Sequence, residues 1–141
     1  MTLDSFRLQL CDIQGRLFER SGAEGLDSAS FARAFMEGPV GAGYDLPFDR
    51  TQWMGEAYLL DEVRDLAGGL VAAGLSYSAD ALYWMGYTYR WWHFFTGESS
   101  AQIHRIADAE TMNANYAGFH TIGMDLAVEN LKELHRLSDA R

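Results

Sequence analysis

One segment, from Ser78 to Thr96, constrains the fold more than any other part of the chain. It reads SADALYWMGYTYRWWHFFT and carries eight Phe, Tyr and Trp rings. Ser78 is a favourable N-cap, and Gly97 is well placed to end a helix. At helical spacing the rings cover two neighbouring faces, and a helix that is apolar on most sides must be buried. The sequence therefore predicts one long aromatic helix at the centre of the protein.

This segment is long enough to cross a membrane, but its composition is not that of a membrane span. Asp80, Arg90 and His93 interrupt it. Its bulk comes from Tyr and Trp, whereas spanning helices are rich in Leu, Val and Ile. We therefore interpret it as the core helix of a soluble domain.

Periodic apolar residues and capping signals predict further helices on both sides of this segment. Before the aromatic segment they are Leu3–Arg20, Leu26–Glu37 and a helix from the capping-box variant Asp49-x-x-Gln52 to Gly68, with Trp53, Ala57, Leu60 and Val63 inward. After it they are a short helix opened by the capping box Ser99-x-x-Gln102, a helix through Met112 and Tyr116, and a last helix over Leu126–Leu137. Asp125 caps this last helix, and its Leu131 and Leu134 face inward. The stretch Gly38–Asp49, GPVGAGYDLPFD, holds both prolines and predicts a loop. No stretch alternates as a strand does. We expect an all-α fold, with residues 1–141 forming a single domain: a compact bundle of five to seven helices around the aromatic-rich one.

The charge of the chain restricts its partners. It holds 20 Asp and Glu against 11 Lys and Arg, for a net charge of −9. Such a field repels phosphate backbones and anionic lipid and favours a basic protein partner.

The single Cys11 permits no internal disulfide and no cysteine-based metal cage, and in an amphipathic helix it is expected to be buried and inert. The first residues carry no export signal, so we expect a cytoplasmic protein.

No motif for catalysis or metal binding is present in the sequence. The four histidines include no pair at metal-ligand spacing, and neither HExxH nor GxSxG occurs. His104 and Asp108 share a helix face, but a third ligand is missing. The carboxylates Asp61, Glu62 and Asp65 are interpreted as the solvated face of a helix. The sequence therefore predicts a non-enzymatic protein with no cofactor and no metal.

One stripe of the aromatic helix carries polar groups, namely Tyr83, Gly86, Arg90 and His93. A buried arginine needs a carboxylate, a carbonyl or a ring face as its partner. Two outcomes are open for it. Arg90 pairs with a carboxylate, for which Asp61, Glu62 and Asp65 are the candidates considered. Alternatively, Arg90 and His93 form the floor of a pocket for an anionic group, with Tyr83, Tyr116 and His120 as walls.

The segment from Ser99 to Phe119 also has the general plan of a helix-turn-helix DNA reader, with a capped short helix, a tight turn and a second helix. Its second helix, TMNANYAGF, holds no Arg or Lys. An ordinary helical corner is therefore the preferred interpretation, and a DNA-binding regulator is kept as an alternative.

The run YWMGYTYRWWHFFTGESSAQIHRIADAETMNANYAGFHT resembles a family of small helical bacterial proteins of uncharacterised function, which is loosely associated with toxin–antitoxin-like gene neighbourhoods. The resemblance covers roughly residues 53–133. It implies a role in binding a partner protein, and no site residues carry over from it. We therefore expect an interaction or regulatory domain that neutralises a basic partner protein in an antitoxin-like role and that is able to form a homodimer. The alternative is a small-molecule-binding protein or enzyme built on the Arg90 and His93 stripe.

Overall fold

The computed structural model describes residues 2–140, and within this range the fold is all-α, with eight α-helices and one short 3-10 turn, η1. The helices are α1 (Ser5–Ala23), α2 (Ser28–Met36), α3 (Pro39–Asp45), α4 (Glu56–Ala67), α5 (Ala79–Thr96), α6 (Ser100–Ile106), α7 (Ala109–Phe119) and α8 (Met124–Asp139), and η1 spans Arg50–Trp53. The expected number of five to seven helices was therefore too low. The described residues form no strand, and their one β-bridge joins Leu26 to Ala73.

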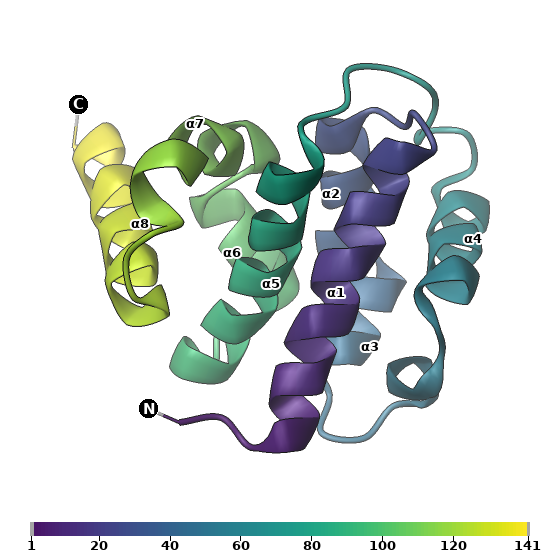
Figure 1. Cartoon of the computed structure of the whole chain (residues 1–141), viewed down its shortest axis with the longest axis horizontal. Helices are drawn as coiled ribbons and strands as arrows, with labels where there is room; N and C mark the ends of the chain where they lie inside the picture. The colour runs from purple at the N-terminus through teal and green to yellow at the C-terminus, as the bar shows by residue number, and fades with distance from the viewer. Residues whose placement is uncertain (1, 141) are drawn as a thin grey trace.

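Helices α1 and α5 lie side by side at the centre of the fold and share its largest helix–helix interface. Figure 1 shows α2 and α3 behind α1, α4 on one side, and α6, α7 and α8 on the other. Glycines let the two central helices approach closely. A Cβ atom at Gly86 would lie 2.5 Å from the carbonyl oxygen of Gln14, and one at Gly15 would lie 2.8 Å from the Tyr83 ring. The α1–α5 contact is therefore a contact of backbone on backbone, which only small residues permit.

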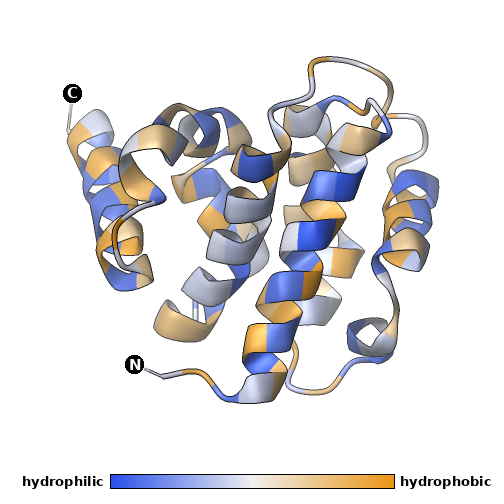
Figure 2. Cartoon of the chain, in the orientation of Figure 1, coloured by the Kyte–Doolittle hydropathy of each residue, from blue (hydrophilic) through white to orange (hydrophobic). Residues whose placement is uncertain are grey.

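The predicted central aromatic helix is confirmed as α5. Ser78 caps its start by accepting a hydrogen bond from the Ala81 amide, and Gly97 ends it in the left-handed conformation at φ +79°. Met85, Tyr89 and Trp92 are completely buried. Figure 2 nevertheless shows α5 pale over most of its length, because Tyr and Trp have nearly neutral hydropathy. Among the described residues, no helix combines the length and the apolar character that a membrane span requires.

The loop predicted over Gly38–Asp49 is wrong for most of its length, since residues Pro39–Asp45 form α3. Pro39 occupies the start of the helix, where its missing N–H costs nothing. Gly41 serves close packing rather than chain reversal, because a Cβ there would lie 2.3 Å from the Phe35 carbonyl oxygen. Val40 and Tyr44 are buried. Tertiary packing on α2 thus overrides the local signal of the glycines.

The helix predicted from Asp49 to Gly68 is interrupted. Asp49 does cap a helical turn, η1, but an extended residue follows it and α4 begins only at Glu56. Trp53, predicted to face inward, is 72% exposed. Leu60 and Val63 are buried as predicted.

Two capping predictions have different outcomes. The capping box at Ser99 and Gln102 is present at the start of α6. The last helix begins two residues earlier than expected, with Gly123 rather than Asp125 at the N-cap position. Leu131 is buried there, but Leu134 is 40% exposed, because only one narrow stripe of α8 meets the rest of the fold.

Candidate functional site

Arg90 is completely buried and joins four helices through its guanidinium group. Its Nε donates to Gln14 Oε1 of α1 at 2.7 Å, its Nη1 to Asp45 Oδ1 of α3 at 2.6 Å, and its Nη2 to Ser100 Oγ of α6 at 2.8 Å. The Ser100 backbone N–H also donates to Asp45 Oδ2 at 2.8 Å. The Tyr44 ring lies 5.4 Å from the guanidinium carbon, within cation–π range.

This network gives Arg90 the internal salt bridge expected as one of its two outcomes, but with an unexpected partner. The acid is Asp45, in the segment predicted to be a loop, and not Asp61, Glu62 or Asp65. Each of the three guanidinium nitrogens donates a hydrogen bond inside the protein, and the side chain is 0% exposed, so the group is not accessible from the surface. Arg90 is therefore a structural residue that holds the helices together.

His93 lies at the edge of the same network. Its Nδ1 donates to the Glu98 carbonyl oxygen at 2.7 Å and is 3.6 Å from Asp45 Oδ1. The ring lines a cleft of about 440 Å³ on the α1 side, beside Arg7 and Phe48. Phe48 is 86% exposed. The structure therefore separates His93 from Tyr83, Tyr116 and His120, the predicted walls of the pocket.

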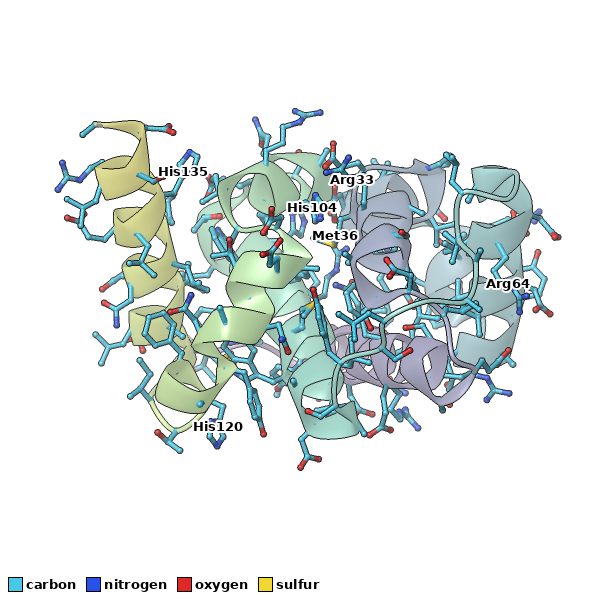
Figure 3. The ribbon with its side chains drawn as sticks, turned by 90° about the horizontal axis from the view of Figure 1, so that it is seen from above. Arg33, Met36, Arg64, His104, His120 and His135 are labelled. Carbon is cyan, nitrogen blue, oxygen red and sulfur yellow. The ribbon has the colours of Figure 1, made fainter. Side chains whose placement is uncertain are left out.

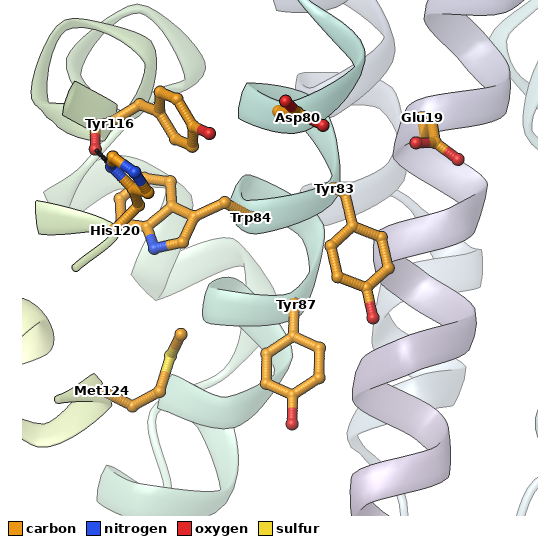
Figure 4. A pocket seen from close by; sticks show the side chains of 8 residues that line it. All are labelled: Glu19, Asp80, Tyr83, Trp84, Tyr87, Tyr116, His120 and Met124. Carbon is orange, nitrogen blue, oxygen red and sulfur yellow. Dashed lines mark hydrogen bonds between the residues drawn. The ribbon is translucent and has the colours of Figure 1, made fainter. Parts of the chain in front are cut away.

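Tyr83, Tyr116 and His120 do come together, in a different place. They line an open cleft of about 500 Å³ between α1, α5, α7 and the start of α8 (Figure 4). We call it the aromatic cleft. Its lining consists of Glu19, Asp80, Tyr83, Trp84, Tyr87, Tyr116, His120 and Met124. The structure brings neither Arg90 nor His93 into it.

The rings of the aromatic cleft form two groups on the surface of α5. Tyr83 and Tyr87, one turn apart, have their ring centres 6.0 Å apart. On the other side, Trp84 meets Tyr116 edge to face at 5.9 Å, and Tyr116 stacks on His120 at 4.3 Å. Figure 4 shows the two groups on either side of the cleft, with Asp80 and Glu19 at one end and Met124 at the other.

The net charge of the aromatic cleft is negative. Burial raises the pKa of Tyr83, and the hydrogen bond that its hydroxyl donates to Asp12 at 2.5 Å raises it further. Burial likewise raises the pKa of Tyr87, so both phenols are neutral at pH 7. The charge therefore comes from Glu19 and Asp80. Within residues 2–140, neither carboxylate has a Lys, Arg or His nitrogen within 4.0 Å.

Two nitrogen atoms add to the chemistry of the aromatic cleft. His120 Nδ1 donates to the Tyr116 carbonyl oxygen at 2.7 Å, which leaves Nε2 as an acceptor in the neutral ring. The indole N–H of Trp84 is buried without an acceptor among the described residues. Trp84 is only 6% exposed, and Figure 4 shows its nitrogen on the side of the ring toward Met124.

The remaining histidines do not assemble a metal site. Figure 3 shows His104, His120 and His135 far apart. His104 Nδ1 contacts Glu37 at 2.5 Å, and Asp108 caps α7 instead of sharing a ligand set with His104. In the part of the chain that the structure describes, no three His, Cys, Asp or Glu side chains are placed to hold a metal ion.

Comparison with known proteins adds no relative, since no protein family, curated protein or solved structure matches the chain. The resemblance to antitoxin-associated proteins therefore stays a prediction.

The sequence predicted three residues of the aromatic cleft as site residues, and five others were missed: Glu19, Asp80, Trp84, Tyr87 and Met124. Asp80 precedes Tyr83 by three positions and Trp84 by four, so helical spacing alone places all three on one side of α5. Glu19 had no comparable signal, because it comes from α1 and joins the cleft only through the packing of α1 on α5.

Proposed function

We propose that this protein is a non-enzymatic cytoplasmic interaction domain whose aromatic cleft receives a cationic side chain of a basic partner protein. The observation that carries the proposal is a pair of carboxylates, Glu19 and Asp80, at one end of a cleft lined by rings (Figure 4). Neither has a cationic partner within 4.0 Å among residues 2–140. Cations are attracted both to ring faces and to carboxylates, and Tyr and Trp are common anchors of protein interfaces. The net charge of −9 steers a basic partner toward the protein.

The neighbouring arginines of α1 are each paired with a carboxylate other than Glu19. Arg16 pairs with Asp12 at 2.8 Å, and Arg20 pairs with Glu24 at 3.3 Å, both on α1. They border the adjacent cleft, which shares Glu19 with the aromatic cleft. Because Asp12 and Glu24 offset the charges of these two arginines, the unpaired charge in this region is that of Glu19 and Asp80, and a partner cation is expected between Glu19 and the α5 rings.

The alternative of an anion-binding pocket at Arg90 has no support in the geometry, because the guanidinium is completely buried and each of its nitrogens already donates to Gln14, Asp45 or Ser100. For a DNA reader, α7 would be the recognition helix, and it contains Glu110 but no Lys or Arg. Absence of duplex DNA binding at low salt is the expected result, since phosphate contacts need basic side chains.

Affinity capture from the lysate of the native host tests the proposal. Bait variants are the wild type, the double variant Glu19→Gln/Asp80→Asn, and the control Asp61→Asn, which removes an exposed carboxylate on α4 that does not line the aromatic cleft. We expect a stoichiometric basic partner that is retained by the wild type and Asp61→Asn, is lost from the double variant, and dissociates as salt is raised.

Two further results bear on the proposal. If the captured partner arrests growth when produced alone, and co-production of the wild-type chain but not the double variant restores growth, the antitoxin-like role is supported. Equal capture by the wild type and the double variant would place the interface elsewhere. Light scattering of the purified chain, alone and with the partner, tests the predicted homodimer.

A further inference from the structure

We propose that a second cleft of this protein binds a small, uncharged aromatic molecule that donates one hydrogen bond to the side chain of Gln52. This cleft is the one of about 440 Å³ that includes His93, and we call it the Phe48 cleft. Its lining shares no residue with that of the aromatic cleft. The inference is therefore independent of the proposed function.

Three segments meet to form the Phe48 cleft, and each contributes a phenylalanine ring. Phe6 comes from the start of α1, Phe48 from the link between α3 and η1, and Phe94 from the last turns of α5. Figure 1 shows these three segments at the same end of the molecule. The volume lies in the range of small-molecule sites, which are concave, mostly apolar and supplied with a few polar groups.

Gln52 places one unused hydrogen-bond acceptor in this lining. Asp49 caps the turn η1 by accepting from the Thr51 amide at 3.0 Å, and Gln52, in the same turn, is only 3% exposed. Its Nε2 donates to the Leu46 carbonyl oxygen at 2.6 Å and lies 3.4 and 3.5 Å from two further carbonyl oxygens. These acceptors fix the orientation of the amide, because the reversed amide would set Oε1 against them.

The Oε1 atom of Gln52 is buried and has no donor among the described residues. A buried acceptor without a donor is destabilising, so a ligand that brings an N–H or O–H group to it gains a hydrogen bond and relieves this cost. A molecule of the same shape without the donor gains only the apolar contact. The ligand is therefore expected to carry one donor on an otherwise apolar body.

The exposed side chains beside Gln52 favour an aromatic body. Phe48 is 86% exposed, and Leu46 and Trp53 of the same segment are 52% and 72% exposed. Single exposed apolar residues are ordinary, but several together beside a cleft indicate a contact surface. A flat ring in the cleft would meet the rings of Phe6, Phe48 and Phe94, and contacts between rings are more favourable than the buried area alone predicts.

The Asp and Arg charges at the Phe48 cleft cancel, which favours an uncharged ligand. Asp45 is offset by the buried Arg90, whose Nη1 lies 2.6 Å from it. Arg7 has no carboxylate within 4.0 Å among residues 2–140, but its guanidinium carbon lies 5.4 Å from the centre of the Phe94 ring, and Asp4 lines the same cleft. A charged ligand would therefore meet repulsion as well as attraction and would lose its hydration.

A titration followed by NMR tests the inference, with the side-chain amide signals of Gln52 as the reporter and the indole signal of Trp84 as the reporter of the other cleft. The probes are indole, which has one N–H donor, and benzofuran, which has the same shape and no donor. Indole-3-acetate and tryptamine add a negative and a positive charge. We expect indole to shift the Gln52 signals, benzofuran to bind about three- to ten-fold more weakly, and neither charged probe to bind more tightly than indole.

Variants locate the binding. Phe48→Ala should weaken indole binding at least about three-fold and should leave the fold intact, because the ring is exposed in the free protein. Leu70→Ala is the matched control, since Leu70 is 79% exposed and does not line the cleft. Gln52→Met, if a far-UV circular dichroism spectrum shows that it is folded, should remove the preference for indole over benzofuran. If it unfolds, the comparison of the two probes on the wild type decides the same point.

Several results would overturn the inference. Equal binding of indole and benzofuran would show that Gln52 accepts no hydrogen bond from the ligand. Tighter binding of indole-3-acetate or tryptamine would overturn the uncharged class. No shift of the Gln52 signals, or equal effects of Phe48→Ala and Leu70→Ala, would overturn the site. None of these results changes the proposal for the aromatic cleft, which is tested by the partner protein.

Discussion

Replacement of Arg90 by methionine should destabilise the fold more than any other single loss of charge in the described residues. Methionine removes the guanidinium but keeps an apolar side chain in the buried site, so the cavity left behind is small. Removing one partner of a buried ion pair costs about 3–5 kcal/mol. Asp45 is 14% exposed and keeps its hydrogen bonds from Ser100, so the cost of leaving its carboxylate unpaired lies near the lower end of this range.

A second contribution comes from Gln14. Its side chain is completely buried, and its Oε1 loses its donor when Arg90 is removed. An unsatisfied buried acceptor costs about 1–3 kcal/mol. Together the two effects give a loss of about 4 kcal/mol in the free energy of unfolding. For a domain of this size the melting temperature should fall by about 8–16 °C.

Urea unfolding followed by tryptophan fluorescence measures this loss, with Arg64→Met as the matched control. Arg64 is 44% exposed and pairs with Glu24 at 3.4 Å, so its replacement should cost less than about 1 kcal/mol. The double variant Arg90→Met/Asp45→Asn should be more stable than the sum of the two single losses predicts, by about 1–3 kcal/mol. The reason is that the double variant no longer contains the unpaired carboxylate of Asp45. A loss below 1 kcal/mol in Arg90→Met, or strict additivity in the double variant, would refute the reasoning.

Three further predictions concern packing, pH and thiol reactivity. Gly86→Ala should cost about 1–3 kcal/mol in urea unfolding, because its Cβ would lie 2.5 Å from the Gln14 carbonyl oxygen. Gly118→Ala, in open space on α7, should be neutral or stabilise by up to about 1 kcal/mol. Hydrogen bonds from the Ser30 hydroxyl and amide lower the pKa of Asp27 below its ordinary value of 3.8, so the stability it contributes is present at pH 7 and is lost as the pH falls through the lower folded-state pKa. Asp27→Ala should therefore cost about 0.5–2 kcal/mol at pH 7 and much less at pH 2–3. Burial raises the pKa of Cys11 to about 12, so a thiol reagent at pH 8 should label it only as fast as the protein unfolds.

Each of these predictions has a clear contrary result. Equal stability of the two glycine variants would mean that α1 and α5 separate easily. A cost of Asp27→Ala that does not change with pH would show that its charge is not what stabilises the native state. Complete labelling of Cys11 within seconds in native buffer would contradict its burial.

Much of the fold could be predicted from the sequence because its signals are local. The N-cap at Ser78 and the capping box at Ser99 act through residues three positions away, and the structure contains both. The many aromatic rings of α5 require burial, whichever elements pack around the helix. The all-α class and the central place of α5 follow from such signals alone.

Tertiary structure alone decided the partners of these elements. Asp45 lies 45 positions from Arg90, and the two side chains pair only because α3 packs against α2 and α6. The glycines of α3 predicted a loop, so no local signal indicated this helix. The aromatic cleft is likewise assembled from α1, α5, α7 and α8, and Glu19 joins it only through the α1–α5 contact. Helix formation is set by hydrogen bonds within a few residues, whereas a site depends on how helix surfaces fit together, which no short stretch of sequence encodes.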